Sequence, residues 1–196
     1  MALTVAERVQ RFRLSHPETV KERKARWRKY LRDNGICQWC QASPALPDES
    51  RCQPCVDKGK VRRIANQQTW LSLGLCGMCG RYPHLPAMSD NLTYRVCEEC
   101  YIRKTAKNCL GSMRQWKVIR QKLYDQEFKC TYTGTLLILG DNASLDHIYP
   151  LHSYPHLKSD PANTEWVLQE VNEMKRNRTP EQFLALIQHI LNYRAS

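Results

Sequence analysis

The chain contains ten cysteines, and eight of them stand in four Cys-x-x-Cys pairs. The pairs repeat, because "NGICQWC" followed by "SRCQPC" is echoed 39 residues later by "LGLCGMC" followed by "YRVCEEC". A Cys-x-x-Cys turn brings two thiolates to one edge of a tetrahedron, and a second pair closes the site with Zn–S distances of about 2.3 Å. The sequence therefore predicts two structural Zn²⁺ sites. Their ligands are Cys37, Cys40, Cys52 and Cys55 in the first site and Cys76, Cys79, Cys97 and Cys100 in the second.

Other uses of these cysteines fit less well. Disulfides are rare in the reducing cytosol, and an iron–sulfur cluster suits a different spacing. A closed site with four thiolates has no open position for a substrate, so both ions are expected to be structural. Each module is too short to hold a core of its own, and metal binding should therefore be coupled to folding. Cys109 and Cys130 stand outside the pairs and are predicted to be small, buried, apolar residues.

An acidic residue and a histidine stand side by side in the stretch "ASLDHIYPLH". Adjacent residues of a strand point to opposite faces. One of Asp146 and His147 should therefore point to a place that needs a charge or a base. A hydrogen-bonded strand end is the plainer alternative.

The elements around this pair differ from those of the cysteine-rich part. From residue 128 onward, two apolar, β-rich runs, "TLLILG" and "ASLDHIYP", are separated by Gly140-Asp141-Asn142, which predicts a hairpin. A proline-punctuated loop follows, then a short strand "TEWVLQ" and a helix "EVNEMKRNR". Thr179 to Gln182 is a capping start for a final amphipathic helix. Its apolar side is expected to carry Phe183, Leu184, Ile187, Ile190 and Leu191.

Residues 128 to 179 resemble the HNH (ββα-metal) nuclease family. The resemblance rests on "LDHIYPL", on Asn163 in "ANTEWVL" and on Asn172 in "EVNEMKRN", which agree with the family in order and spacing. It implies that His147 is the general base that activates the attacking water. It also implies that Asp146 and Asn172 hold one Mg²⁺, or Mn²⁺ in its place, which polarises the scissile phosphate. Asn163 corresponds to the middle residue of the family motif, which holds the loop and orients the base through hydrogen bonds.

The chain departs from the family pattern in two places. Many members carry a structural zinc between two Cys-x-x-Cys pairs, but the corresponding positions here are Cys130 to Thr133 and Leu168 to Val171, so this domain is expected to bind no zinc. The loop lacks the Gly-Gly pair common in the family and contains His152 and His156, which are expected to be hydrogen-bonding residues rather than ligands. Three cations after Asn172 could clamp the phosphates next to the cut, or simply be helix-end cations. They are Lys175, Arg176 and Arg178.

The positive charge of the chain lies in its first two thirds. Residues 1–127 contain 24 lysines and arginines against 12 aspartates and glutamates, whereas residues 128–196 contain 6 against 7. This bias predicts polyanion binding, with nucleic acid favoured over membrane because no lipid-facing stripe accompanies it; a solvated surface is the alternative. A helix through "ETVKERKARWRKYLRDN" has Val20, Trp27 and Leu31 near one face. The predicted DNA contacts on its other faces are Lys21, Arg23, Lys24, Arg26, Arg28 and Lys29.

These features predict an α+β chain of several modules, with two small Zn(Cys)4 zinc-ribbon-like modules and a C-terminal ββα-metal nuclease domain. The expected boundaries are a basic helical arm at 1–34, a first zinc module at 35–66, a second zinc module at 67–109, a linking helix at 110–127 and the nuclease domain at 128–196. The N-terminus turns charged at once, and no apolar run approaches the ~20 residues of a membrane span. An intracellular, cytoplasmic location is therefore expected.

The expected function is metal-dependent, site-specific cleavage of double-stranded DNA, with the basic arm and the zinc modules finding the target. This layout is similar to that of homing and phage-borne HNH endonucleases. A restriction-type HNH enzyme is one alternative. A non-catalytic zinc-dependent DNA-binding regulator and an RNA-binding zinc-ribbon protein are two others, because Zn(Cys)4 modules and basic helices do not by themselves separate DNA from RNA.

Overall fold

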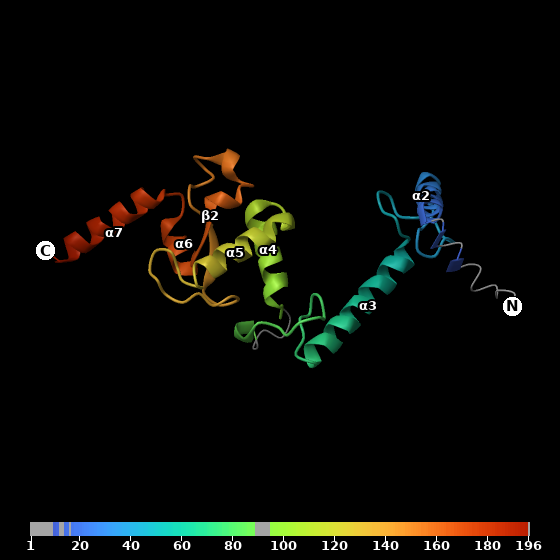
Figure 1. Cartoon of the computed structure of the whole chain (residues 1–196), viewed down its shortest axis with the longest axis horizontal. Helices are drawn as coiled ribbons and strands as arrows, with labels where there is room; N and C mark the ends of the chain where they lie inside the picture. Colours follow the sequence, from blue (N-terminus) through green and yellow to red (C-terminus); the bar gives the residue numbers. More distant parts are fainter. Residues whose placement is uncertain (1–9, 12–13, 16, 89–94, 196) are drawn as a thin grey trace. The chain divides into compact units, whose positions relative to one another are not determined.

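The computed structural model describes residues 10–11, 14–15, 17–88 and 95–195, so parts of the predicted N-terminal arm lie outside the described residues (Figure 1). The chain divides into two compact units, Met1–Ala65 (unit 1) and Asn66–Ser196 (unit 2). Helices dominate both, and one two-stranded sheet lies in unit 2. The predicted mixture of helices with a small sheet is confirmed. Among the described residues, no helix combines the length and the apolar character that crossing a membrane requires.

Unit 1 contains the basic helix α2 (Pro17–Asp33). The helix is terminated just before Gly35, whose φ of +62° is a left-handed conformation that glycine adopts without strain, and Ile36 N then donates to Leu31 O at 2.7 Å. Of the expected apolar stripe, Leu31 is buried but Trp27 is 48% exposed and stacks on Tyr30. The basic faces of α2 are therefore open to solvent along most of its length.

A long helix, α3 (Gln53–Ser72), starts in unit 1 directly after Cys52 and is an addition to the elements expected from the sequence. Its 20 residues span about 30 Å. None of its residues is buried. Its stability therefore depends on how its two ends are held, and the first end is held by Cys52 and Cys55.

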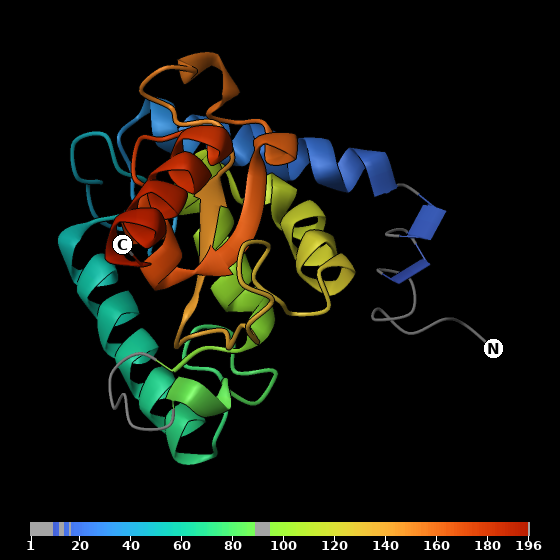
Figure 2. The same cartoon turned by 90° about the vertical axis from the view of Figure 1, so that its left-hand side faces the viewer.

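Unit 2 contains the sheet and most of the buried core. Besides the end of α3, its described helices are α4 (Glu98–Leu110), α5 (Trp116–Asp125), α6 (Gln169–Lys175) and α7 (Pro180–Ala195). Single helical turns are η1 (Pro86–Met88), η2 (Met113–Gln115), η3 (Pro155–Leu157) and η4 (Pro161–Asn163). The strands are β1 (Ala143–His147) and β2 (Thr164–Leu168), which pair antiparallel with Leu145 opposite Trp166 (Figure 2).

The core of unit 2 forms where α4 and α5 pack on the sheet. Trp166 is fully buried, and its indole Nε1 donates to Ile119 O at 2.8 Å, so the largest core side chain also satisfies its polar atom. Ile119 and Leu123 are fully buried on α5, as the predicted linking helix requires. Trp116, at the start of α5, is only partly buried, and Met113 in η2 is 51% exposed.

The predicted hairpin between "TLLILG" and "ASLDHIYP" is wrong. The first run forms only an isolated bridge between Lys129 and Leu136, and β1 pairs instead with β2 across the proline-punctuated loop. The side chain of Asn142 makes the hydrogen bonds that a neighbouring strand would otherwise make to this run. Its Oδ1 accepts from Ile138 N at 2.7 Å, and its Nδ2 donates to Leu136 O. Leu137 and Leu139 are buried, which explains the strand-like alternation of a segment that is in fact a loop.

The final helix α7 begins close to the expected residue, but the predicted apolar side is mostly exposed. Phe183 is buried against Tyr132, and Ile187 is partly buried against the core. Leu184, Ile190 and Leu191 are 46–57% exposed. Amphipathic spacing therefore predicted the helix correctly and its burial incorrectly.

Three loops of the chain share one backbone pattern, in which a residue three or four positions after a helix end forms an isolated bridge with a residue seven or eight positions later. The bridges are Ile36–Pro44, Leu75–Pro83 and Lys129–Leu136. In each loop the cysteine after the bridge residue accepts, through its backbone oxygen, a hydrogen bond from the residue four positions later, which has a positive φ. Two of these loops belong to the four-cysteine clusters, and the third lies in unit 2 before β1.

Candidate metal centres and active site

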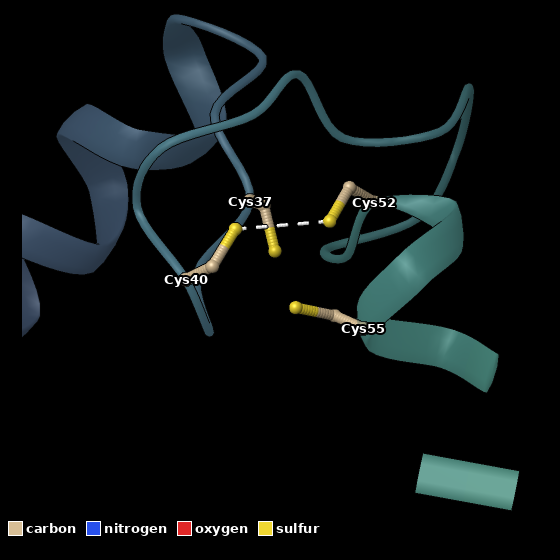
Figure 3. Close-up of side chains that lie close together, drawn as sticks. All are labelled: Cys37, Cys40, Cys52 and Cys55. Carbon is tan, nitrogen blue, oxygen red and sulfur yellow. Dashed lines mark hydrogen bonds between the residues drawn. The ribbon is translucent and has the colours of Figure 1, made fainter. Parts of the chain in front are cut away.

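The first four cysteines meet in unit 1. Cys37 and Cys40 come from the loop after α2, and Cys52 and Cys55 come from the start of α3; their side chains point toward one another (Figure 3). All four sulfur atoms lie within 4.8 Å of one another, and Cys40 Sγ is 3.7 Å from Cys52 Sγ. A tetrahedron with arms of about 2.3 Å has edges of roughly 3.8 Å. The donor set and its spacing therefore fit Zn²⁺.

The second cluster has the same construction in unit 2. Its sulfur atoms, from Cys76, Cys79, Cys97 and Cys100, also lie within 4.8 Å of one another. Cys79 Sγ is 3.8 Å from Cys97 Sγ. The last two cysteines stand at the start of α4, as Cys52 and Cys55 stand at the start of α3. The prediction of two four-cysteine sites that fit two structural zinc ions is confirmed.

The thiols of the first cluster differ in acidity. Burial raises the pKa of Cys37, but hydrogen bonds from the backbone of Cys40 and Cys52 outweigh it and bring that pKa down to about 6. Burial, followed by the neighbouring sulfur atoms, raises the pKa of Cys55 to about 12. Four thiolates at this separation repel one another, so the fully ionised cluster requires a cation.

The third loop has the same backbone but only one of the four thiols. Cys130 is buried, and its Sγ lies 3.4 Å from Leu168 N, at the start of α6. Leu168 and Val171 occupy the positions before and within α6 that cysteines occupy at the starts of α3 and α4. Val171 is buried in the main core. Apolar side chains thus occupy the positions at which the other two loops are joined by cysteines from a helix start.

One cleft of unit 2 brings together residues that are far apart in the chain. Asp146 and His147 line it from β1, and Asn172 lines it from α6. Asn172 Nδ2 donates to Ser144 Oγ at 2.9 Å, which leaves its Oδ1 as the atom that can take a metal ion. The three residues predicted to act together therefore share one cavity wall.

Asp146 is a buried carboxylate with both oxygen atoms engaged. Oδ1 accepts from His147 N at 2.8 Å, and Oδ2 lies 2.9 Å from Lys175 Nζ. A carboxylate offers about four lone-pair sites, so each oxygen keeps the capacity to bind one more partner. Asp146 and Asn172 together supply the oxygen donors that Mg²⁺ prefers.

His147 is partly buried at the end of β1. Burial lowers the pKa of its imidazole; a hydrogen bond to the backbone of Lys158 and the charge of Asp146 oppose this shift. The net effect is a lowered pKa, which keeps the imidazole neutral at physiological pH. A neutral imidazole is the form that can accept a proton.

Asn163 holds the chain that leaves His147. Its Oδ1 accepts from Tyr149 N at 2.8 Å, and its Nδ2 donates to Tyr149 O at 3.0 Å. Ile148 N also donates to Asn163 O. The side chain is buried and its hydrogen bonds go to both backbone groups of Tyr149, so Asn163 holds the loop in place.

The expectation that Lys175 contacts DNA is wrong. Its side chain is fully buried, and its Nζ donates to His147 O at 2.7 Å in addition to the pair with Asp146. A nucleic-acid phosphate has no access to it. Arg176 is exposed, and Arg178 is partly buried and donates to Met174 O at the helix end. The six predicted contacts on α2, from Lys21 to Lys29, are all exposed.

Two groups of residues were not expected from the sequence. The first is a set of exposed cations on α3, in the run "KGKVRR": Lys58, Lys60, Arg62 and Arg63. The second is on α4, where Cys109 lies in the same cleft as His147 and is only partly buried, contrary to the expectation of a buried apolar residue. The charge run was visible in the sequence, whereas the place of Cys109 follows only from the packing of α4 on β1.

No protein-family model matches the chain, and no similar curated protein or solved structure was found. A function for this protein must therefore be argued from its own residues.

Proposed function

We propose that this protein is a metal-dependent, site-specific DNA endonuclease of the HNH type. The observation that carries the proposal is the shared cleft of Asp146, His147 and Asn172, in which a neutral imidazole stands beside two oxygen donors. The resemblance of residues 128 to 179 to the HNH family assigns these same residues to hydrolysis of a phosphodiester bond.

In this reaction His147 takes a proton from the water that attacks the scissile phosphate. Asp146 and Asn172 would hold one Mg²⁺, or Mn²⁺ in its place, and such an ion supplies charge stabilisation at the leaving 3′ oxygen. Asn163 keeps the loop after β1 in place through Tyr149. Lys175 fixes the carboxylate of Asp146 and the backbone oxygen of His147 at the same time.

The positive charge of unit 1 supports delivery of this site to duplex DNA. Residues 1–65 contain 15 lysines and arginines against 7 aspartates and glutamates. The cations of α2 and α3 are exposed, and α3 is about as long as one turn of B-DNA. Neutralised phosphates release counterions, which gives such a surface affinity for DNA of any sequence. A DNA-binding unit separate from the nuclease domain fits the layout of a homing or phage-borne enzyme better than that of a restriction-type enzyme.

A non-catalytic DNA- or RNA-binding protein is the second candidate. The observation that favours it is the engagement of both Asp146 oxygens, since Lys175 already balances the charge that a metal ion would balance. In that case the cleft residues would stabilise the fold, and the zinc clusters and basic helices would do the binding.

The experiment is incubation of the purified full chain with a mixed pool of duplex DNA, with and without added Mg²⁺ and with no chelator present, beside a gel shift with duplex DNA and structured RNA. The proposal predicts cuts at defined sites that require Mg²⁺, and tighter binding of DNA than of RNA. Binding without cleavage across a pool that covers all short sequences would support the second candidate. Preferential binding of RNA would contradict the DNA assignment.

A further inference from the structure

The second four-cysteine cluster is continuous with the core that holds the cleft. Its buried neighbours, Met88 and Val96, pack with the cysteines, and Leu85 and Tyr101 contact both this group and the main core. Tyr101 also donates through its hydroxyl to Ala143 O, in the first residue of β1, at 3.3 Å. The same side chains therefore contact both the four-cysteine cluster and the core that includes β1, the strand of Asp146 and His147.

One helix joins the cluster to the cleft. α4 starts directly after Cys97 and includes Cys100, and at about 1.5 Å per residue its 13 residues extend roughly 20 Å. Its later turns contribute Thr105, Asn108 and Cys109 to the cleft wall. A shift of the cluster end of α4 would therefore move the wall at its other end.

At that end, Cys109 Sγ lies 3.7 Å from His147 Nδ1 and 3.6 Å from Nε2. Near-equal distances place the sulfur beside the ring rather than in line with either nitrogen. Burial and the charge of Asp146 raise the pKa of the Cys109 thiol to about 11. The thiol is therefore uncharged at neutral pH where it packs against the imidazole of His147. The position of His147 thus depends on the position of α4.

Two further contacts hold the start of α4 and the loop before it. Glu98 accepts from Arg120 Nε on α5 at 2.7 Å and from the Tyr124 hydroxyl at 3.0 Å. Met88 packs so closely against Gly140 that a Cβ there would lie 2.8 Å from its Cε atom. Gly140 stands three residues before β1, so this contact also reaches the catalytic strand.

The first cluster has no such continuity. Its buried cysteines, Cys37 and Cys52, belong to neither of the buried clusters found among the described residues. They lie in unit 1, with Leu31 as the buried apolar residue of α2. The two clusters have the same four-cysteine ligand set. Only the second packs against the buried core that holds the cleft.

We propose that the second four-cysteine centre positions the catalytic cleft, through α4, whereas the first serves the DNA-binding unit alone. The catalytic part of this proposal rests on the proposed nuclease function. The structural part, that a metal ligand at the start of α4 controls the order of β1, does not depend on any activity.

The test compares Cys97→Ser with Cys52→Ser in the full chain, because each cysteine directly precedes its helix. Zinc content and hydrogen exchange of the β1 amides are measured for both. We expect each variant to lose one zinc ion, Cys97→Ser to raise exchange in β1 by roughly tenfold or more, and Cys52→Ser to leave it unchanged. Loss of zinc from Cys97→Ser with wild-type protection of β1 would overturn the proposal.

Tyr101→Phe tests positioning without touching a metal ligand, which matters if Cys97→Ser unfolds unit 2 as a whole. We expect wild-type zinc content, a melting temperature lowered by no more than a few degrees, and a single-turnover cleavage rate lowered about fivefold, as for one lost hydrogen bond. Tyr193→Phe on α7 is the matched control. An unchanged rate for Tyr101→Phe would overturn positioning. Absence of cleavage by the wild type would instead refute the nuclease function and leave the exchange comparison as the test of the structural link.

Discussion

Lys175 Nζ lies 2.9 Å from Asp146 Oδ2, although the lysine side chain is fully buried. A buried charge is expensive unless it is paired and hydrogen-bonded, and this ammonium group also donates to His147 O at 2.7 Å. The pair joins α6 to the end of β1, where the two candidate catalytic residues stand. It orders the site before any metal ion or substrate is present.

Replacing Lys175 with methionine should therefore be strongly destabilising. The substitution keeps the length of the side chain but leaves Asp146 buried without its partner, and we expect a loss of about 3–5 kcal/mol in the free energy of unfolding. Urea unfolding followed by tryptophan fluorescence measures it. The double variant Asp146→Asn, Lys175→Met should recover most of the loss. A loss below about 1 kcal/mol in the single variant would show that the pair is not a structural element.

Removal of zinc should unfold the two clusters together with the segments they hold. The clusters bring eight thiols into two groups that cannot all ionise without a cation, so we expect two zinc ions per chain and release of both by a strong chelator at neutral pH. Helical circular dichroism should fall as the metal leaves, because Cys52 and Cys97 start α3 and α4. Elemental analysis that found fewer than two ions in the protein purified with zinc would contradict this assignment.

The cations of α3 should contribute to DNA affinity as phosphate contacts. Lys58→Ala combined with Arg62→Ala should weaken binding of every duplex to a similar degree and reduce the slope of log K against log salt by about 2. Arg194→Ala, an exposed cation at the end of α7, is the control and should leave the slope unchanged. An unchanged slope in the double variant would mean that these side chains are solvated and not in contact with DNA.

The third loop should accept a zinc ion once its thiols are supplied. It has the backbone hydrogen bonds of the other two loops, and Cys130 Sγ already lies 3.4 Å from the backbone of Leu168. The triple variant Thr133→Cys, Leu168→Cys, Val171→Cys should bind three zinc ions per chain. Thr133→Cys alone, with only two thiols, should still bind two. Two ions in the triple variant would show that the resemblance of the loops ends at the backbone.

The parts of the fold that follow from local rules could be predicted from the sequence. Cys-x-x-Cys spacing predicts metal clusters because two thiols of one turn are neighbours whatever surrounds them. Gly35, with its left-handed φ, follows the end of α2, close to the end of the helix expected from the sequence. Helix α3 could not be predicted in this way because none of its residues is buried, so it has no apolar periodicity to detect.

The parts that depend on distant partners could not be predicted. Leu137 and Leu139 alternate like a strand, yet Asn142 supplies the hydrogen bonds that a ladder would have made. Lys175 looked like a surface cation because its partner is 29 residues earlier in the chain. Cys109 has no sequence signal for its place beside His147, since only the packing of α4 on β1 brings them together.

The assignment of His147 as the base of a metal-dependent nuclease is tested by comparing His147→Ala with the wild type. Cleavage of a mapped duplex is measured in Mg²⁺ together with affinity for the same duplex in buffer with neither added Mg²⁺ nor chelator, with His152→Ala, an exposed loop histidine, as control. We predict that His147→Ala loses cleavage by at least about 100-fold, keeps its affinity within about twofold, and that His152→Ala retains both. Wild-type cleavage by His147→Ala would contradict the assignment of the base and, with it, the proposed mechanism.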